Sequence, residues 1–298
     1  MSTNVRAIGL LLASIGFITV VDTIAKLKTA DLHPLHIVWG YFFGISLTLG
    51  TYAMIRRRTG FVATMRTRRL PLHMARTLAM MTSIGMLFIA LQWLPLADCT
   101  AINFTSPLFI TALSVPMLGE RVGPHRWAAV AIGLAGVLLI VQPGSNLAQW
   151  AALLPLAGAF FFALYQLTTR VLSSTEPTFR TLMYTGVGGL FWCSLLVPFF
   201  WRPMELADWG LFVFIGLLGA AAHLCLISAF GLAEASLLAP FNYSKIIWAT
   251  IAGYLVFGEL PTLNTLAGAA IIAAAGLYVL WRENRSEVSR LRPAPPRA

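Results

Sequence analysis

Charged side chains inside long apolar stretches are the residues of this sequence best suited to chemistry. Lys245 lies near the middle of the apolar stretch 235–257, and Asp22 lies about two-thirds of the way along the stretch 7–28. An ionised group this deep in a hydrocarbon layer is costly unless it faces protein or water. Lys245 could anchor a substrate carboxylate or phosphate, and Asp22 could bind a cationic amino group or carry a proton. Three alternatives remain open: a structural ion pair between the two, a lysine kept neutral by desolvation, and an aspartate at the interfacial end of its helix.

Matched polar clusters accompany these charges. Asn103 belongs to the stretch 96–118, and Asn242 and Tyr243 belong to the stretch 235–257. The clusters could line a central cavity or form hydrogen bonds between helices. Pro107 and Pro240 lie beside them but occupy different positions in the two stretches, so we expect the two stretches to bend differently.

Further candidates are single polar or aromatic residues in other apolar stretches. His223 could relay protons, although a lone histidine in such a segment is more often satisfied by neighbouring backbone or hydroxyl groups. Arg76, near the start of the stretch 71–93, is expected to extend toward lipid headgroups, with a substrate contact as the alternative. The deep aromatic side chains that could stack on an aromatic or cationic ligand are Trp39, Tyr41, Tyr165 and Trp248.

The elements that must position these residues are apolar helices. Hydrophobic residues make up 58% of the 298 residues and charged residues 11%, a balance typical of chains that span a bilayer of about 30 Å. We expect ten membrane helices, and we interpret the first apolar stretch as a helix rather than a cleaved signal peptide. The expected helices are 7–28, 34–55, 71–93, 96–118, 126–142, 148–170, 178–200, 209–230, 235–257 and 264–281. Close packing of helices is predicted at Gly40-x-x-x-Gly44 and Gly216-x-x-Gly219.

Basic residues indicate the orientation. With a cytoplasmic N-terminus, sixteen of the 21 Lys and Arg residues fall on the inner side, against three on the outer side. Inner loops of membrane proteins are rich in Lys and Arg, so both termini are expected in the cytoplasm. This bias also explains the net charge of +10 without nucleic acid as a partner. The tail 282–298, rich in Arg and Pro, is expected to be a disordered cytoplasmic segment.

The two halves of the chain resemble each other. Asn103 precedes Glu120 by as many residues as Asn242 precedes Glu259, and a Gly-Glu pair ends both segments. These glutamates could be proton or ion sites, or charges at the N-terminus of the following helix. The match predicts repeats 1–142 and 148–281, of five helices each. Because five is odd, the second repeat must insert upside down, an arrangement typical of secondary transporters.

Several kinds of site are missing from the sequence. It contains no phosphate-binding Gly-Lys loop, no His/Glu metal motif and no recognisable Ser/His/Asp set. Its three cysteines fall in apolar stretches without metal-ligand spacing. We therefore expect no catalytic residues, no metal and no cofactor, and predict that the protein is not an enzyme.

These motifs resemble the drug/metabolite transporter superfamily, and specifically its ten-helix EamA-type carriers. The resemblance rests on Leu94-Pro95-Leu96-Ala97, Ser106-Pro107-Leu108-Phe109, Leu118-Gly119-Glu120-Arg121 and their counterpart Phe257-Gly258-Glu259-Leu260-Pro261. It implies an all-α integral membrane protein with two inverted five-helix repeats around a central cavity, which transports without ATP hydrolysis.

The resemblance also includes the YddG-like exporters of aromatic amino acids. We therefore expect a secondary transporter, an exporter of hydrophobic or aromatic amino acids, in the cytoplasmic (inner) membrane of a bacterium. Its partners would be the small-molecule substrate and membrane lipids, and it would act as a monomer. The alternatives are transport of drugs, nucleotide-like metabolites or S-adenosylmethionine and, more distantly, a membrane-embedded protein acting on lipids.

Overall fold

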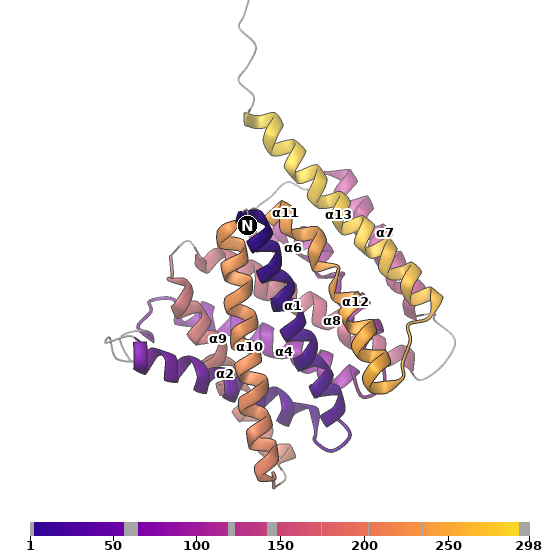
Figure 1. The fold of residues 1–298 in the computed structure, drawn as a ribbon. Helices are drawn as coiled ribbons and strands as arrows, with labels where there is room; N and C mark the ends of the chain where they lie inside the picture. The colour runs from indigo at the N-terminus through magenta and orange to yellow at the C-terminus, as the bar shows by residue number, and fades with distance from the viewer. Residues whose placement is uncertain are drawn as a thin grey trace, which may run out of the picture.

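The protein folds as a bundle of helices (Figure 1). The computed structural model describes residues 3–56, 65–118, 123–141, 148–173, 175–201, 203–233 and 235–291, and this part of the chain contains no strand. The helices are α1 (Thr3–Lys28), α2 (Pro34–Arg56), α4 (Leu70–Ala90), α5 (Leu96–Asn103), α6 (Ser106–Leu118), α7 (Pro124–Val141), α8 (Ala148–Ser173), α9 (Thr178–Leu196), η1 (Val197–Phe200), α10 (Leu206–Leu232), α11 (Ala235–Asn242), α12 (Lys245–Ala252), η2 (Gly253–Phe257) and α13 (Leu263–Leu291).

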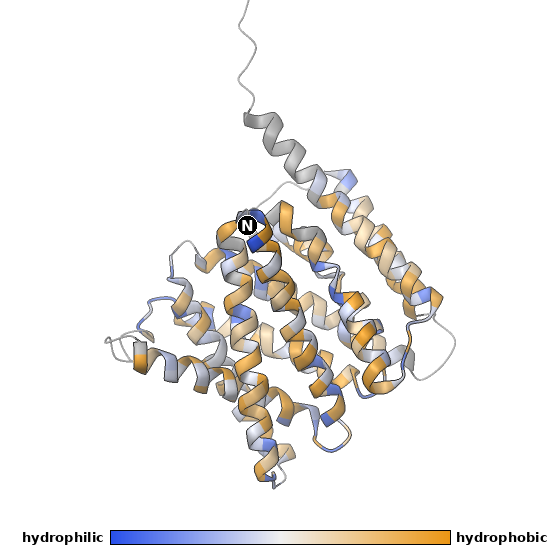
Figure 2. Ribbon diagram, viewed as in Figure 1, coloured by the Kyte–Doolittle hydropathy of each residue, from blue (hydrophilic) through white to orange (hydrophobic). Residues whose placement is uncertain are grey.

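Length and composition make most of these helices candidates for crossing a membrane. Among the described residues, seven spans are long and apolar enough, and one of them, Leu96–Met117, covers both α5 and α6. Three shorter apolar helices are Trp127–Val141, Lys245–Phe257 and Leu263–Val279. Together these segments occupy the positions of the ten expected stretches, and the count of ten crossings stays a prediction. Polar residues gather in the loops and at helix ends, whereas apolar residues dominate the helices (Figure 2).

Two of the expected helices are broken, which corrects the expectation of continuous helices over 96–118 and 235–257. α5 ends at Asn103 and α6 begins at Ser106, while α11 ends at Asn242 and α12 begins at Lys245. Pro107, the second residue of α6, has no N–H to continue the backbone ladder of α5. α11 and α12 break at the corresponding turn although Pro240 lies within α11. The two segments thus bend alike, contrary to the prediction from their prolines.

The last helix also differs from expectation. α13 continues to Leu291, so residues 282–291 are helical rather than disordered. This segment contains Arg, Glu and Leu, which favour helix, and no Gly or Pro. The first proline of the tail is Pro293, and a residue before proline is disfavoured in the helical conformation.

Small residues bring two helices into backbone contact, as predicted. Gly44 in α2 lies directly against Gly216 in α10, where an added Cβ on either glycine would overlap the backbone of the other helix. Gly40 accommodates the ring of Phe212, and Gly219 accommodates the ring of Tyr41. The predicted packing role of these glycines is confirmed.

The pairing of helices positions the interior of the bundle. α1 packs along α10, α4 along α8, and α7 along α13, with α2 and α9 in contact with each other. The first helix starts and the last helix ends at the same end of the bundle (Figure 1). The broken helices contact members of these pairs: α12 packs against α1, and α5 packs against α8. The two broken helices also contact each other through α5 and α12.

Candidate functional site

Asp22 and Lys245 form an ion pair. The Lys245 Nζ lies 2.9 Å from the Asp22 Oδ2. The Asp22 side chain is 7% exposed and that of Lys245 is 22% exposed, so the carboxylate is the more deeply buried partner. The structure therefore joins the two charges that the sequence left as either substrate anchors or partners of each other.

The broken helices explain where this pair forms. Lys245 is the first residue of α12, directly after the turn that ends α11, and Asp22 lies on α1, which packs against α12. The N-terminus of a helix carries a partial positive charge, which disfavours a cation. The Asp22 carboxylate offsets both this effect and part of the cost of burying the ammonium group.

The two breaks meet through aromatic rings. Phe104 and Tyr243 occupy equivalent turns, and their ring centroids lie 5.0 Å apart in an edge-to-face arrangement. The Tyr243 hydroxyl lies against Gly276 of α13, where an added Cβ would collide with it. This hydroxyl is buried and has no hydrogen-bond partner among the described residues. A buried hydroxyl without a partner is costly, and it could bond to a polar ligand group.

Further polar residues continue from the ion pair into the bundle. Tyr41 of α2 is buried, and its ring lies against Gly219 of α10. Tyr165 of α8 places its ring 4.8 Å from the Arg76 guanidinium. His223 of α10 has a buried Nε2 without a partner among the described residues. Of these residues, Tyr165 and Arg76 are in direct contact, which joins α8 to α4.

Arg76 is the most deeply buried of these charges. The residue is 1% exposed, so it does not extend to headgroups, which corrects that expectation. Its Nη1 donates to Thr169 Oγ1 at 3.2 Å, and its Nη2 donates to the Thr181 carbonyl at 2.7 Å and to Thr185 Oγ1 at 2.5 Å. These bonds tie α4 to α8 and α9.

The spacing of polar residues in the sequence could have predicted this burial, although the position of Arg76 along its helix could not. Four polar residues of α4 are spaced so that they share one side of the helix, and all four are buried: His73, Arg76, Thr77 and Ser83. A polar stripe on one side of a membrane helix must face protein, because lipid offers no hydrogen-bond partners. The other residue missed was Phe104, whose role depends on the break in its helix.

Other predicted residues lie apart from the ion pair. Trp39 donates its Nε1–H to Ser194 Oγ at 2.9 Å and stacks on Phe43 at 5.3 Å, between α2 and α9. Trp248 is 42% exposed on α12. Asn103 is half-buried and Asn242 is exposed, each at the last residue of the helix before a break. Their roles in binding stay predictions.

Ion pairs join segments at the end of the bundle opposite the N-terminus. Lys26 at the end of α1 pairs with Glu259 and donates to the Leu94 carbonyl at 3.1 Å. The expected bond of Glu259 to the N-terminus of the following helix is absent from the described contacts, because Thr262 caps α13 by accepting the Thr265 N–H at 3.1 Å. Glu120 lies outside the described residues.

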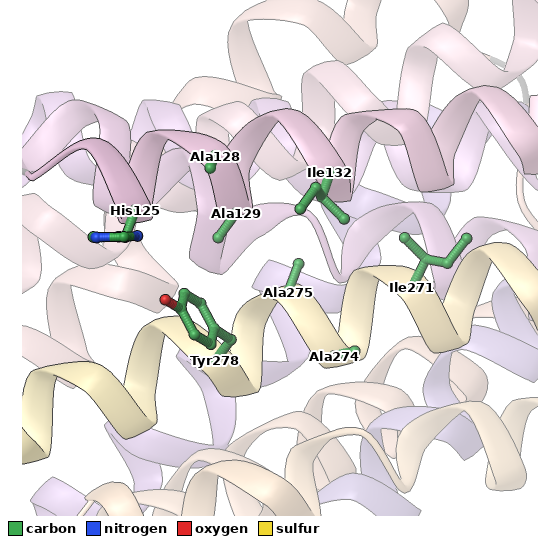
Figure 3. Close-up of a pocket in the computed structure, with 8 residues that line it drawn as sticks. All are labelled: His125, Ala128, Ala129, Ile132, Ile271, Ala274, Ala275 and Tyr278. Carbon is green, nitrogen blue, oxygen red and sulfur yellow. The ribbon is translucent and has the colours of Figure 1, made fainter.

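A groove of about 400 Å³ lies elsewhere, between α7 and α13 (Figure 3). Its walls are mostly alanine and isoleucine side chains, with His125 and Tyr278 at one end. None of the predicted binding residues lines it. The part of the chain that the structure describes contains no group of three His, Cys, Asp or Glu residues able to hold a metal ion.

Comparison with known proteins gives this interior a family context. A riboflavin transporter of Rhizobium johnstonii is 33% identical, over 95% of this chain and 93% of that protein. An S-adenosylmethionine uptake transporter of Rickettsia bellii is 25% identical over 96% and 97%, and a pseudopaline exporter of Pseudomonas aeruginosa is 28% identical over 90% and 94%. One protein of known crystal structure shares the fold, with a TM-score of 0.61 and 19% identity over 95% of this chain and 99% of that one.

The family model agrees with these relatives and with the drug/metabolite transporter resemblance. The model of the EamA-like transporter family matches this sequence twice, over residues 5–142 and 149–281. The two matches leave only the ends and a short connection uncovered. Because these matches cover nearly the whole sequence and a relative is 33% identical over 95% of it, this chain belongs to the EamA-like transporter family.

Proposed function

We propose that this protein is a secondary carrier that moves a small polar metabolite with a planar ring system through the interior lined by Asp22, Lys245, Tyr243 and Tyr165. The observation that carries the proposal is the Asp22–Lys245 ion pair at the break between α11 and α12. A charged pair at a discontinuous helix is typical of transporter binding sites, because a ligand with charges of its own can replace either partner.

The proposed architecture is two inverted repeats of five helices, residues 1–142 and 148–281. The helix pairings support it. In chain order, α1, α2, α4 and α7 of the first half correspond to α8, α9, α10 and α13 of the second half. The contact between α1 and α10 then corresponds to that between α8 and α4, and the contact between α2 and α10 corresponds to that between α9 and α4. The pairs α2–α9 and α7–α13 convert into themselves. The matching breaks and the double match of the family model point the same way.

The ligand class follows from the rings and from the relatives. Phe104, Tyr243 and Tyr165 lie near the ion pair or near Arg76 and could stack on a flat ring. The relatives named above are described as transporting riboflavin, S-adenosylmethionine and pseudopaline. The export of aromatic amino acids expected from the sequence has no support among them. We therefore favour the alternative of nucleotide-like metabolites or S-adenosylmethionine. The described relatives include both uptake and export proteins, so the assay must measure both directions.

Counterflow in proteoliposomes tests the proposal. Labelled riboflavin, S-adenosylmethionine and tryptophan are offered to liposomes preloaded with the same unlabelled compound, with and without a pH gradient. We expect exchange of riboflavin or S-adenosylmethionine, no exchange of tryptophan, and a loss of about tenfold or more in Lys245→Met, the factor that a lost charge-assisted hydrogen bond represents.

Lys28→Met is the matched control. Lys28 lies on the same helix as Asp22 but pairs with Asp208 at the end of the bundle, 3.1 Å away, so its exchange rate should stay near that of the wild type. Equal exchange by Lys245→Met and wild type would reject the binding role of the ion pair. Absence of exchange for a wide panel of metabolites by folded protein would reject the carrier.

We also propose a cytoplasmic location for both termini. The bias of basic residues supports it, as does the position of both described ends at one end of the bundle (Figure 1). A reporter fused after Ala298 should be active only in the cytoplasm, and activity in the periplasm would overturn this orientation.

A further inference from the structure

Arg76 has no ionic partner in the part of the chain that the structure describes. Its guanidinium is bonded to two threonine hydroxyls and one backbone carbonyl, all of them neutral. A guanidinium has five N–H donors and stays protonated in proteins. Neutral acceptors satisfy its hydrogen bonds but leave the charge uncompensated, and a buried charge without a counter-ion is costly.

The buried charges of the interior do not cancel. Asp22 and Lys245 neutralise each other, which leaves the positive charge of Arg76. The hydroxyl groups of Tyr41 and Tyr165 add polarity but no compensating carboxylate. The sum over Asp22, Lys245 and Arg76 is therefore one positive charge. The half-buried Asp98 of α5 bonds to Thr265 and not to Arg76, so a ligand with one negative group beside Arg76 would balance the guanidinium locally.

Donor groups next to Arg76 are also unused. Three of the five guanidinium N–H groups have acceptors, and the buried Nε has no partner among the described residues. The His223 Nε2 on α10 is another buried polar atom without a partner among the described residues. The Tyr165 ring lies over the guanidinium and limits the directions from which an anion can approach.

We propose that Arg76 is the subsite for the anionic group, a carboxylate or a phosphate, of the transported metabolite. This proposal rests on the proposed function and narrows it to metabolites that carry a carboxylate or phosphate, which favours S-adenosylmethionine over the uncharged riboflavin. Thr169 and Thr185 hold the guanidinium in position for the anion. A structural role alone, as a tie between α4, α8 and α9, would explain the three hydrogen bonds but not the excess charge.

Arginine-selective labelling tests the proposal on the intact wild-type protein. Detergent-purified protein is treated with phenylglyoxal, and peptide mass spectrometry follows the modification of Arg76 in the presence of inorganic phosphate, acetate, or sodium chloride at equal ionic strength. Arg180, whose side chain is 25% exposed and pairs with Glu176, serves as the internal reference. We expect saturable protection of Arg76 by phosphate or acetate of about tenfold, and no protection of Arg180 beyond that given by chloride.

Each outcome decides the proposal. Protection by phosphate alone assigns a phosphate subsite, and protection by acetate alone assigns a carboxylate subsite. An Arg76 that is never modified, or that is modified equally in all three salts, overturns the subsite. Arg76→Lys and Arg76→Gln add a second measurement: phosphate or acetate should raise the melting temperature of the wild type and of Arg76→Lys but not of Arg76→Gln.

The labelling result is independent of transport. Anion protection without exchange of any metabolite would leave the subsite in place and reject the carrier. Exchange of a metabolite without anion protection would leave the carrier in place and reject the subsite.

Discussion

Removing one partner of the Asp22–Lys245 pair should destabilise the protein, and removing both should restore much of the loss. Lys245→Met leaves a carboxylate that is 7% exposed without its counter-ion, while Asp22→Asn leaves an ammonium group that is 22% exposed. The ammonium group left in Asp22→Asn can be hydrated more easily than the carboxylate left in Lys245→Met, so Lys245→Met should be the more destabilising single change. In Asp22→Asn with Lys245→Met neither member of the pair is left as an unpaired buried charge.

The magnitude follows from the geometry. Two unit charges 2.9 Å apart attract each other by about 6 kcal/mol at an effective dielectric constant of about 20. Desolvation of both groups cancels much of this attraction, and breaking a buried pair typically costs about 3–5 kcal/mol. We therefore expect a loss of about 3 kcal/mol in Lys245→Met, about half as much in Asp22→Asn, and about 1 kcal/mol or less in the double variant. The resulting coupling free energy is about 3.5 kcal/mol or slightly more.

Thermal unfolding in detergent provides the measurement, with ligand-free protein and all four members of the cycle. About 3 kcal/mol corresponds to a fall of roughly 6–12 °C in melting temperature for domains of 150–250 residues. Lys28→Met serves as the control, because a pair with a 31% exposed lysine should contribute about 1 kcal/mol or less. A double variant that loses as much stability as the two single variants together would refute the coupling and, with it, the structural importance of the pair.

Three further changes test other parts of the structure by the same melting assay. Gly216→Ala should prevent the close approach of α10 to Gly44 and cost about 2 kcal/mol or more, whereas Gly50→Ala, with nothing within 4 Å of the added Cβ, should be neutral or stabilising. Thr262→Val should remove the cap of α13 and cost about 1 kcal/mol. Although burial, the largest effect, raises the pKa of the Glu176 carboxyl, bonds from neighbouring hydroxyl and guanidinium groups outweigh it and lower that pKa below its usual 4.5. The stabilisation by Glu176 is therefore present above the unfolded pKa and lost as the pH falls through the folded one, so the melting temperature of Glu176→Gln should fall less over this range than that of the wild type.

The apolar stretches predicted the helices well because a bilayer demands about 20 apolar residues per crossing, a requirement visible in composition alone. The breaks before Ser106 and Lys245 were missed for the same reason. Apolar residues lie on both sides of the short polar turns 103–106 and 242–245, so the mean hydropathy of the whole stretch does not distinguish a broken helix from a straight one. The Asn-containing clusters and Pro107 marked the right positions, but they are equally common in continuous helices.

The sequence predicted several residues of the candidate site, but it did not predict which of them contact each other. Asp22 and Lys245 stood out because charges are costly in apolar helices, and only the packing of α1 against α12 shows that they pair. Trp39 and Trp248 were chosen for depth along their helices. Depth does not specify which side of a helix faces the interior, so the structure places both away from the pair. The burial of Arg76 was not predicted for the same reason, because the side of its helix that faces the interior was not considered.

Lys245 is the first residue of α12, a position at which the polarity of the ion pair affects stability. A carboxylate at a helix N-terminus gains about 0.3–1 kcal/mol from the helix dipole, and an ammonium group there loses a similar amount. A chain with the two charges exchanged, lysine on α1 and aspartate at the start of α12, would keep the pair and improve this interaction. Stability alone would thus favour the opposite polarity. The natural orientation instead places an ammonium group at the break between α11 and α12, where the first N–H groups of α12 already donate to the carbonyls of Tyr243 and Ser244, so the positive charge at this break comes from the Lys245 side chain itself.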